Sequence, residues 1–197
     1  MTLPLLNKVN ADYRVQFGKK VVDIGNKLGF SPALIGGLMA VMYLESGLDP
    51  SKVNPKTGAT GLIQIMPSTA KKLGTTVEDL RTMNGVQQLD YVYKYFLPFK
   101  GKITTYPELY MAMFFPSAVG KSDYHVIKSK DLSAETVAKA NKIFDIHGNN
   151  QITVGEVKEV LWSKTPASIR DFLKTTAGKY AVPITIGTLV MLYLIFR

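Results

Sequence analysis

The sequence contains no cysteine, two histidines and one tryptophan. The absence of cysteine excludes disulfide bonds, thiolate zinc sites and cysteine nucleophiles. Two histidines are too few for most metal centres that are built from imidazole ligands. Acidic residues are also scarce, with 15 against 24 basic ones and a formal net charge of +9. Any catalytic chemistry is therefore expected to depend on a small number of carboxylates.

Basic residues are spread along the chain rather than gathered into one block. Lys19-Lys20 and Lys71-Lys72 are isolated pairs, whereas a nucleic-acid-binding arm typically has a continuous basic run. A net positive charge favours attraction to polyanions in general. On charge alone, the bacterial cell wall, anionic lipid and nucleic acid all stay open as partners. The motifs described below then favour an anionic cell wall and a membrane surface, and no nucleic acid.

The two ends of the chain differ in polarity. Polar and charged residues interrupt residues 1–17, so no secretory signal is expected there. Residues 180–196 contain no charged side chain and are mostly aliphatic or aromatic, which allows roughly 26 Å of helix at about 1.5 Å per residue. Residues 180–197 are therefore predicted to form a C-terminal transmembrane helix, with a buried core helix as the alternative.

Apolar residues recur at helical spacing in most of the remaining sequence. Ser31-Pro32 is typical of a helix start, and the apolar pattern of residues 34–42 ends at Gly47. Residues 49–61 are rich in Pro, Gly, Asn, Ser and Thr and are expected to form a loop beside the end of that helix. The expected fold is mainly α, a compact helical domain with a cleft built by loops.

Glu45 lies in the last turn of this apolar helix. Desolvation and the negative end of the helix dipole both disfavour an ionised carboxylate there, so the pKa of Glu45 is expected to be raised. A carboxyl that stays protonated near neutral pH is a proton donor. A glutamate at a helix end is, on this feature alone, more often a solvated surface residue than a catalytic one. The neighbouring sequence is therefore needed to distinguish the two roles.

The sequence around Glu45 resembles the lytic transglycosylases of the goose-type lysozyme-like superfamily. The resemblance lies in Glu45-Ser46-Gly47 and in residues 54–70, which include Gly61-Leu62-Ile63-Gln64 and Met66-Pro67. In that family the Glu-Ser-Gly element ends the catalytic helix, and the Gly-Leu-x-Gln element with the following Met-Pro lines the sugar cleft. The resemblance covers roughly residues 30–120 and implies a lysozyme-like fold.

The resemblance implies that Glu45 is the single acid/base catalyst and that the substrate is peptidoglycan. Glu45 would protonate the glycosidic oxygen between N-acetylmuramic acid and N-acetylglucosamine, then accept the proton of the muramoyl C6 hydroxyl, which closes on C1 to give a 1,6-anhydro product. Ordinary glycosidases need two carboxylates, whereas here the substrate supplies the nucleophile and catalysis requires no cofactor. If the nearby Asp49 held a water in the cleft, lysozyme-type hydrolysis would be the alternative outcome.

The resemblance also names candidates for substrate binding near Glu45. Gln64 and Met66 match positions that line the cleft. Ser46 is a candidate either for a substrate hydrogen bond or for a cap on the helix end. Among the tyrosines of residues 91–95, Tyr91 is the one expected to reach the site.

A later segment departs from the family pattern. The family's Ala-Tyr-Asn element is replaced by residues 110–120, in which Phe114 takes the tyrosine position. Tyr110, one helical turn earlier, is the candidate for supplying the missing hydroxyl. Such variants resemble transglycosylase domains carried in phage virions, which implies other virion proteins as partners. A non-catalytic, wall-binding virion structural protein is the alternative from another functional class.

Residues 145–156 resemble an EF-hand loop between two helical patterns. The candidate calcium ligands are Asp145, His147, Asn149, Gln151 through its carbonyl, and Glu156. Histidine is a poor calcium ligand and two of the candidates are anionic, so weak calcium binding and a calcium-free helix-loop-helix both stay open. Asn150 occupies the usual glycine position, and no second loop is visible to pair with Ile152.

The sequence thus predicts four segments. Residues 1–130 are expected to form the lysozyme-like transglycosylase domain, 131–165 an EF-hand-like helical unit, 166–179 a linker and 180–197 the transmembrane helix. The expected protein is a membrane-anchored lytic transglycosylase of a virion or of the bacterial inner membrane, with its catalytic domain acting in the periplasm.

Overall fold

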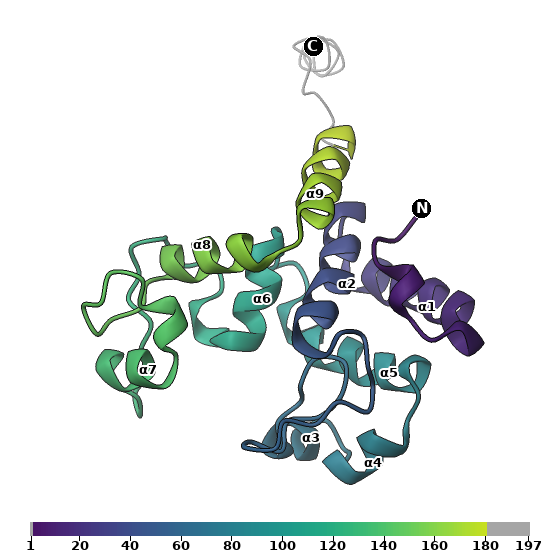
Figure 1. Cartoon of the computed structure of the whole chain (residues 1–197), viewed down its shortest axis with the longest axis horizontal. Helices are drawn as coiled ribbons and strands as arrows, with labels where there is room; N and C mark the ends of the chain where they lie inside the picture. The colour runs from purple at the N-terminus through teal and green to yellow at the C-terminus, as the bar shows by residue number, and fades with distance from the viewer. Residues whose placement is uncertain (1, 181–197) are drawn as a thin grey trace, which may run out of the picture.

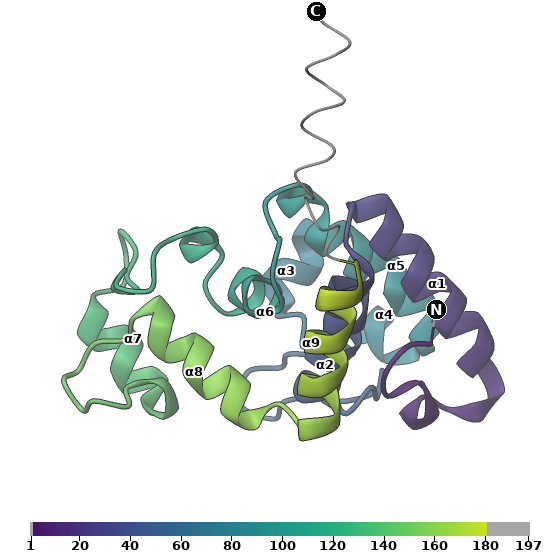
Figure 2. The same cartoon turned by 90° about the horizontal axis from the view of Figure 1, so that it is seen from above.

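The computed structural model describes residues 2–180, which are mainly helical, as predicted (Figure 1). The α-helices are α1 Arg14–Leu28, α2 Pro32–Ser46, α3 Pro67–Lys72, α4 Val77–Thr82, α5 Gly85–Phe96, α6 Tyr106–Phe114, α7 Ala134–Ala140, α8 Val154–Lys164 and α9 Ala167–Tyr180. Short 3-10 helices lie between them: η1 Leu6–Lys8, η2 Ala11–Tyr13, η3 Leu97–Phe99, η4 Pro116–Ala118 and η5 Lys142–Phe144. Helices α7 and α8 lie at one end of the molecule and α1 and α5 at the other, with α2 and α6 between them (Figures 1 and 2).

Helix α2 lies at the centre of the fold, where α1, α6 and α9 pack around it (Figure 2). It begins as the sequence predicts: Pro32 occupies the first turn, and the Ser31 hydroxyl accepts the backbone N–H of Leu34. Nearly all of its residues from Leu34 to Met42 are fully buried. Because α2 is packed on several sides, its C-terminal turn, which carries Glu45, has a fixed position.

Residues 166–179, expected to be a linker, instead form helix α9 and pack against α2. Ile169 and Leu173 are buried at a spacing of four residues, which is the spacing of one helix face. The Phe172 ring approaches Gly36 so closely that a Cβ there would lie 2.2 Å from it. The linker prediction missed this apolar face because charged residues alternate with it along the sequence.

The prediction of a transmembrane helix requires correction. Within residues 2–180, no helix has both the length and the apolar character needed to cross a membrane. The predicted span at 180–197 falls almost wholly on residues 181–197, which lie outside the described residues. Among residues 2–180 the fold is therefore helical and without a membrane-spanning helix, and the expected membrane partner has no support.

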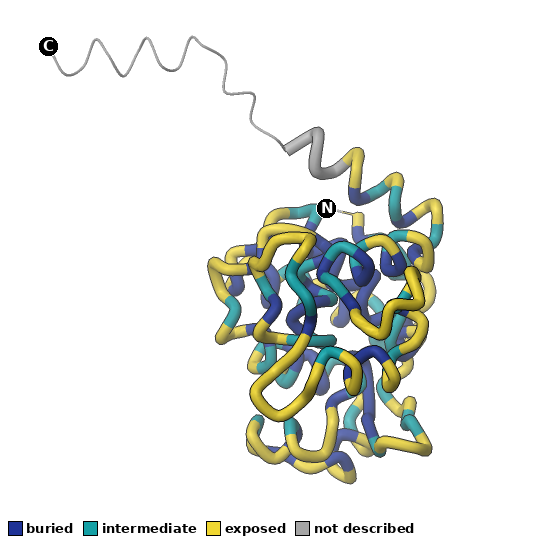
Figure 3. Tube along the Cα trace, turned by 90° about the vertical axis from the view of Figure 1, so that its left-hand side faces the viewer, coloured by how far each residue is buried: buried dark blue, intermediate teal, exposed yellow. Residues whose placement is uncertain are grey.

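Two apolar cores hold the described residues together, and buried positions run through the interior beneath exposed loops (Figure 3). The first core is built around α1, α2 and α5, and also takes Leu161 of α8 and Ile169 of α9. The second lies around α7 and α8, and also takes Met111 of α6 and Ile127. The elements expected to form a separate unit at 131–165 therefore share both cores with the preceding segment.

Candidate active site

Glu45 stands in the last turn of α2, where the chain leaves the helix for a loop. Gly47 has a φ of 71°, a left-handed conformation that suits glycine, and its N–H donates to the Tyr43 carbonyl over 2.8 Å. This turn leaves the Glu45 side chain half-buried beside the loop. Burial raises the pKa of Glu45 from 4.5 to about 7, in the direction expected from the sequence.

Two cavities meet at Glu45 and Tyr110, which line both of them. The loop-side cavity, of about 250 Å³, is lined by Glu45, Ile63, Gln64, Tyr110, Met113 and Phe114. The α8-side cavity, of about 410 Å³, is lined by Leu44, Glu45, Tyr110, Ile143, Phe144, Val160, Leu161 and Lys164. Glu45 therefore borders two separate spaces in which a ligand can lie.

Gln64 lines the loop-side cavity with Glu45, as its place in the sequence motif suggests. Its backbone is left-handed, with a φ of 50°. Its Nε2 donates to the carbonyls of Lys52, over 3.2 Å, and Gly61, over 3.0 Å. These bonds hold the carboxamide at the edge of the cavity. They also fix the loop between α2 and α3, residues 47–66, which is called the cleft loop below.

Gln88 of α5 is a buried residue that the sequence analysis did not identify. Its Oε1 accepts the N–H of Leu62 over 2.9 Å, and its Nε2 donates to the carbonyls of Pro50 and Leu80, each over 2.7 Å. Gly61, with a φ of 82°, lies so close that a Cβ there would be 2.3 Å from this Oε1. One amide thus ties the cleft loop to α5. The available signal was a glutamine within the apolar face of that helix.

Ser46 is buried behind the helix end rather than exposed in a cavity. Its hydroxyl lies 2.9 Å from the Met42 carbonyl and 3.1 Å from the Leu62 carbonyl, and donates to these acceptors. Of the two roles considered for Ser46, this geometry fits the one at the helix end. The bond to the Leu62 carbonyl also joins the end of α2 to the cleft loop.

Tyr95, rather than Tyr91, is the tyrosine of α5 whose pKa is affected by the charge of Glu45, although neither tyrosine lines the two cavities. The Tyr95 hydroxyl donates to the Ala112 carbonyl over 3.0 Å, and burial together with the Glu45 charge raises its pKa to about 12. Tyr91 lies beneath the ammonium of Lys94, 4.7 Å from its ring centre, and lines neither cavity. The surroundings of each tyrosine depend on how α5 is rotated about its own axis. The alternation of tyrosines in the sequence does not specify that rotation.

Tyr110 and Phe114 of α6 both line the loop-side cavity, and their rings stack with centroids 6.2 Å apart. Their role in substrate binding stays a prediction. Burial, and secondarily the Glu45 charge, raises the pKa of Tyr110, so its hydroxyl stays protonated. The structure therefore brings a tyrosine hydroxyl to the site from the position one turn before Phe114. Met66 is 43% exposed at the start of α3 and lines neither cavity beside Glu45.

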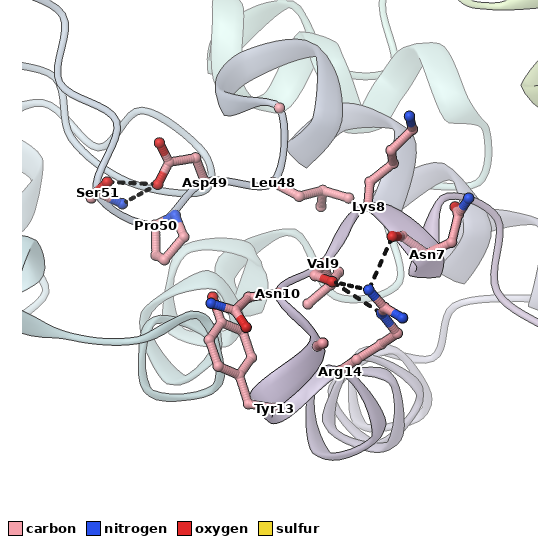
Figure 4. Close-up of a pocket in the computed structure, with 12 residues that line it drawn as sticks. Asn7, Lys8, Val9, Asn10, Tyr13, Arg14, Leu48, Asp49, Pro50 and Ser51 are labelled. Carbon is pink, nitrogen blue, oxygen red and sulfur yellow. Dashed lines mark hydrogen bonds between the residues drawn. The ribbon is translucent and has the colours of Figure 1, made fainter.

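Asp49, the nearest second carboxylate in sequence, belongs to a different cavity (Figure 4). This cavity, of about 580 Å³, lies between residues 7–14 and residues 47–51, and Glu45 does not line it. The Asp49 Oδ1 accepts the N–H and the hydroxyl of Ser51 over 2.8 and 2.7 Å. The carboxylate is thus used within its own loop, and among residues 2–180 Glu45 is the only carboxylate that lines the two cavities beside it.

The family comparison agrees with this geometry. Residues 28–94 match the transglycosylase SLT domain. Neither a curated protein nor a solved structure matches the chain. The SLT match contains Glu45, Gln64 and Gln88, and it ends before α6 and α8, which complete the walls of the two cavities. The predicted resemblance is confirmed for this segment at the level of the SLT domain.

The raised pKa of Glu45 predicts how activity of the SLT domain depends on pH. A general acid must hold its proton in the free enzyme, and Glu45 holds it below about 7 and loses it above. We expect kcat/KM for glycan cleavage to fall as pH rises through about 7, by about tenfold per pH unit above it. A pH–rate profile with purified glycan strands measures this. A midpoint near 4.5, the ordinary pKa, would contradict the assignment.

The EF-hand-like loop predicted at residues 145–156 lies outside the SLT match, and no comparison supports that prediction. The Asp145 carboxylate accepts the N–H groups of Asn149 and Asn150 over 3.0 Å each, and Asn150 is left-handed with a φ of 59°. The Ile127 N–H donates to the Ile152 carbonyl over 2.7 Å, so residue 127 of the same chain provides the pairing for which no second loop was found. His147 is exposed.

Proposed function

We propose that this chain is a lytic transglycosylase that cleaves the peptidoglycan glycan strand between N-acetylmuramic acid and N-acetylglucosamine. The SLT match at residues 28–94 supports peptidoglycan as the substrate. Glu45, half-buried between two cavities with a pKa of about 7, supports general acid catalysis. The periplasm, where peptidoglycan lies, is the expected compartment of this activity.

In the proposed reaction one carboxyl performs both proton transfers. Protonated Glu45 donates its proton to the glycosidic oxygen, the bond from C1 to that oxygen breaks, and the N-acetylglucosamine end leaves as an alcohol. The Glu45 carboxylate then accepts the proton of the muramoyl C6 hydroxyl while O6 bonds to C1. Glu45 is protonated again, no water is consumed, and the product is the 1,6-anhydro sugar.

The position of Asp49 is the observation that favours this reaction over hydrolysis. A hydrolase of this kind needs a second carboxylate to activate a water or to act as nucleophile. Asp49 lines another cavity and accepts two hydrogen bonds from Ser51. Because no second carboxylate from the described part of the chain lines either cavity at Glu45, a substrate that supplies its own nucleophile fits best.

Digestion of purified sacculi tests the enzymatic proposal against a binding role. The protein is expected to release muropeptides from sacculi in proportion to time and enzyme concentration. Binding to sacculi without release would instead identify a wall-binding protein and would overturn the enzymatic proposal. Heat-denatured protein serves as the control for release that does not depend on the folded site.

We also propose weak calcium binding by the loop at residues 145–156. The Glu156 residue is 4% exposed, and its Oε2 accepts from Thr153 at the start of α8, while its Oε1 is buried without a hydrogen-bond partner among the described residues. An unpaired buried carboxylate oxygen is costly, by about 1–3 kcal/mol or more, and a cation would satisfy it. No group of three or more His, Asp or Glu able to hold a metal occurs within residues 2–180, so high affinity is not expected.

Calorimetry tests the calcium proposal. Millimolar calcium is expected to give binding heat with the wild-type chain, and Glu156→Gln is expected to remove most of it because the anionic ligand is lost. Asp131→Asn, outside the loop, is the matched control and should leave the heat unchanged. Absence of heat with the wild-type chain would contradict the proposal.

A further inference from the structure

The α8-side cavity extends the candidate active site beyond the segment that matches the SLT domain. Leu44 and Glu45 come from the matched segment, whereas the opposite wall comes from η5 and α8. Its lining includes Ile143, Phe144 and Leu161, which make it largely apolar. One side of the space at Glu45 is therefore shaped by residues outside the matched segment.

The wall of the α8-side cavity is packed firmly against the rest of the site. The Phe144 ring lies 4.8 Å from the Phe114 ring and 6.2 Å from the Tyr110 ring, measured between centroids. Phe144 is 7% exposed and belongs to the second core. Because Tyr110 and Phe114 also line the loop-side cavity, the same aromatic group supports both sides of Glu45.

Lys164, the last residue of α8, places a cation at the α8-side cavity. The ion pairs found among residues 2–180 join Lys20 with Asp90, Lys27 with Asp23, Lys139 with Glu135 and Lys158 with Asp123, so none of them uses Lys164. The only acidic side chain in the lining is Glu45, which is largely protonated below pH 7. The cavity thus offers apolar surface and one ammonium to a ligand.

We propose that the α8-side cavity receives the muramoyl side of the cleaved bond and that Lys164 pairs with a carboxylate of its peptide stem. This inference rests on the proposed function. A muramoyl sugar differs from N-acetylglucosamine by a lactyl group, which adds a methyl group and carries an acidic peptide. An apolar lining with one cation complements that addition, whereas the loop-side cavity offers the carboxamide oxygen of Gln64 as an acceptor for sugar hydroxyl and acetamido N–H groups. Lys164 is therefore a specificity-determining residue.

The test compares glycan strands that carry peptide stems with the same strands after their stem carboxylates have been converted to neutral amides. Lys164→Glu is expected to lower kcat/KM on the unmodified strands by about tenfold, since it replaces an attraction by a repulsion. On the amidated strands the loss should be about threefold or less, because no stem carboxylate is left to repel. Lys142→Glu is the matched control, an exposed lysine in the same region that lines neither cavity. Equal losses on both substrates, or no loss on either, would overturn the proposal.

A binding measurement keeps this inference separable from the proposed function. Glu45→Gln protein is expected to bind stem-bearing strands without cleaving them, and addition of Lys164→Glu should weaken that binding by about tenfold. Binding of the amidated strands should change by about threefold or less between the two proteins. If the wild type cleaves nothing but this difference in binding appears, the enzymatic proposal fails and the assignment of Lys164 stands. If the wild type cleaves and the difference is absent, the assignment alone fails.

Discussion

Replacement of Glu45 by glutamine is expected to lower muropeptide release by about 10²–10⁴-fold, the usual contribution of general acid–base catalysis. Glutamine has nearly the same shape, so the half-buried position between the two cavities should be kept. The amide has no acidic proton to donate to the leaving oxygen and cannot accept the proton of the C6 hydroxyl. Initial rates of release from sacculi, with circular dichroism as the check on folding, measure this.

Asp49→Asn is the matched control for that experiment. It neutralises a carboxylate four residues later that belongs to the cavity formed with residues 7–14. Asp49 accepts two hydrogen bonds from Ser51, which asparagine Oδ1 can also accept. We expect activity within about twofold of the wild type. A loss comparable with that of Glu45→Gln would make Asp49 a catalytic partner and would favour the hydrolytic mechanism.

Gln88→Leu is expected to lower the free energy of unfolding by about 3 kcal/mol, the largest stability effect predicted here. Leucine removes the acceptor of the Leu62 N–H and the donor to the carbonyls of Pro50 and Leu80. Each backbone group left buried and unpaired costs about 1–3 kcal/mol, partly offset by the apolar replacement and by local relaxation. Because these bonds hold the cleft loop, activity should fall as well. Urea unfolding gives the stability change.

Gln16→Leu is a suitable control for Gln88→Leu, since Gln16 is exposed on α1. The same chemical change there should alter the free energy of unfolding by no more than about 0.5 kcal/mol. Similar values for the two variants would mean that the buried amide network contributes little. Gln88→Leu is also expected to lose more activity than the fraction of unfolded protein accounts for.

The sequence predicts the parts of the site that depend on local pattern. Glu45 lies where it was expected because the helix start at Ser31-Pro32 and the stop at Gly47 are encoded within one short segment. Gln64 lies beside it because its loop follows directly and closes on itself through Gly61. The raised pKa of Glu45 likewise follows from the apolar character of its helix.

Features that depend on contacts between distant segments were not predictable in the same way. The choice between Tyr91 and Tyr95 depends on how α5 is rotated against α6, where Tyr95 finds the Ala112 carbonyl. Gln88 gains its role only when three separate segments meet. The segment expected to be a linker becomes α9 because Gly36 of α2 leaves room for Phe172. In each case the decisive partner lies far away in the sequence.

The composition of the products tests the central claim most directly. Mass spectrometry of muropeptides released from sacculi is expected to show 1,6-anhydromuramoyl ends, each lighter by the mass of one water than the hydrolysed equivalent. This result follows if Glu45 is the single acid/base and the C6 hydroxyl is the nucleophile. Products that carry a reducing muramoyl end, with the water retained, would contradict the account and would show that a water, activated elsewhere in the site, is the nucleophile.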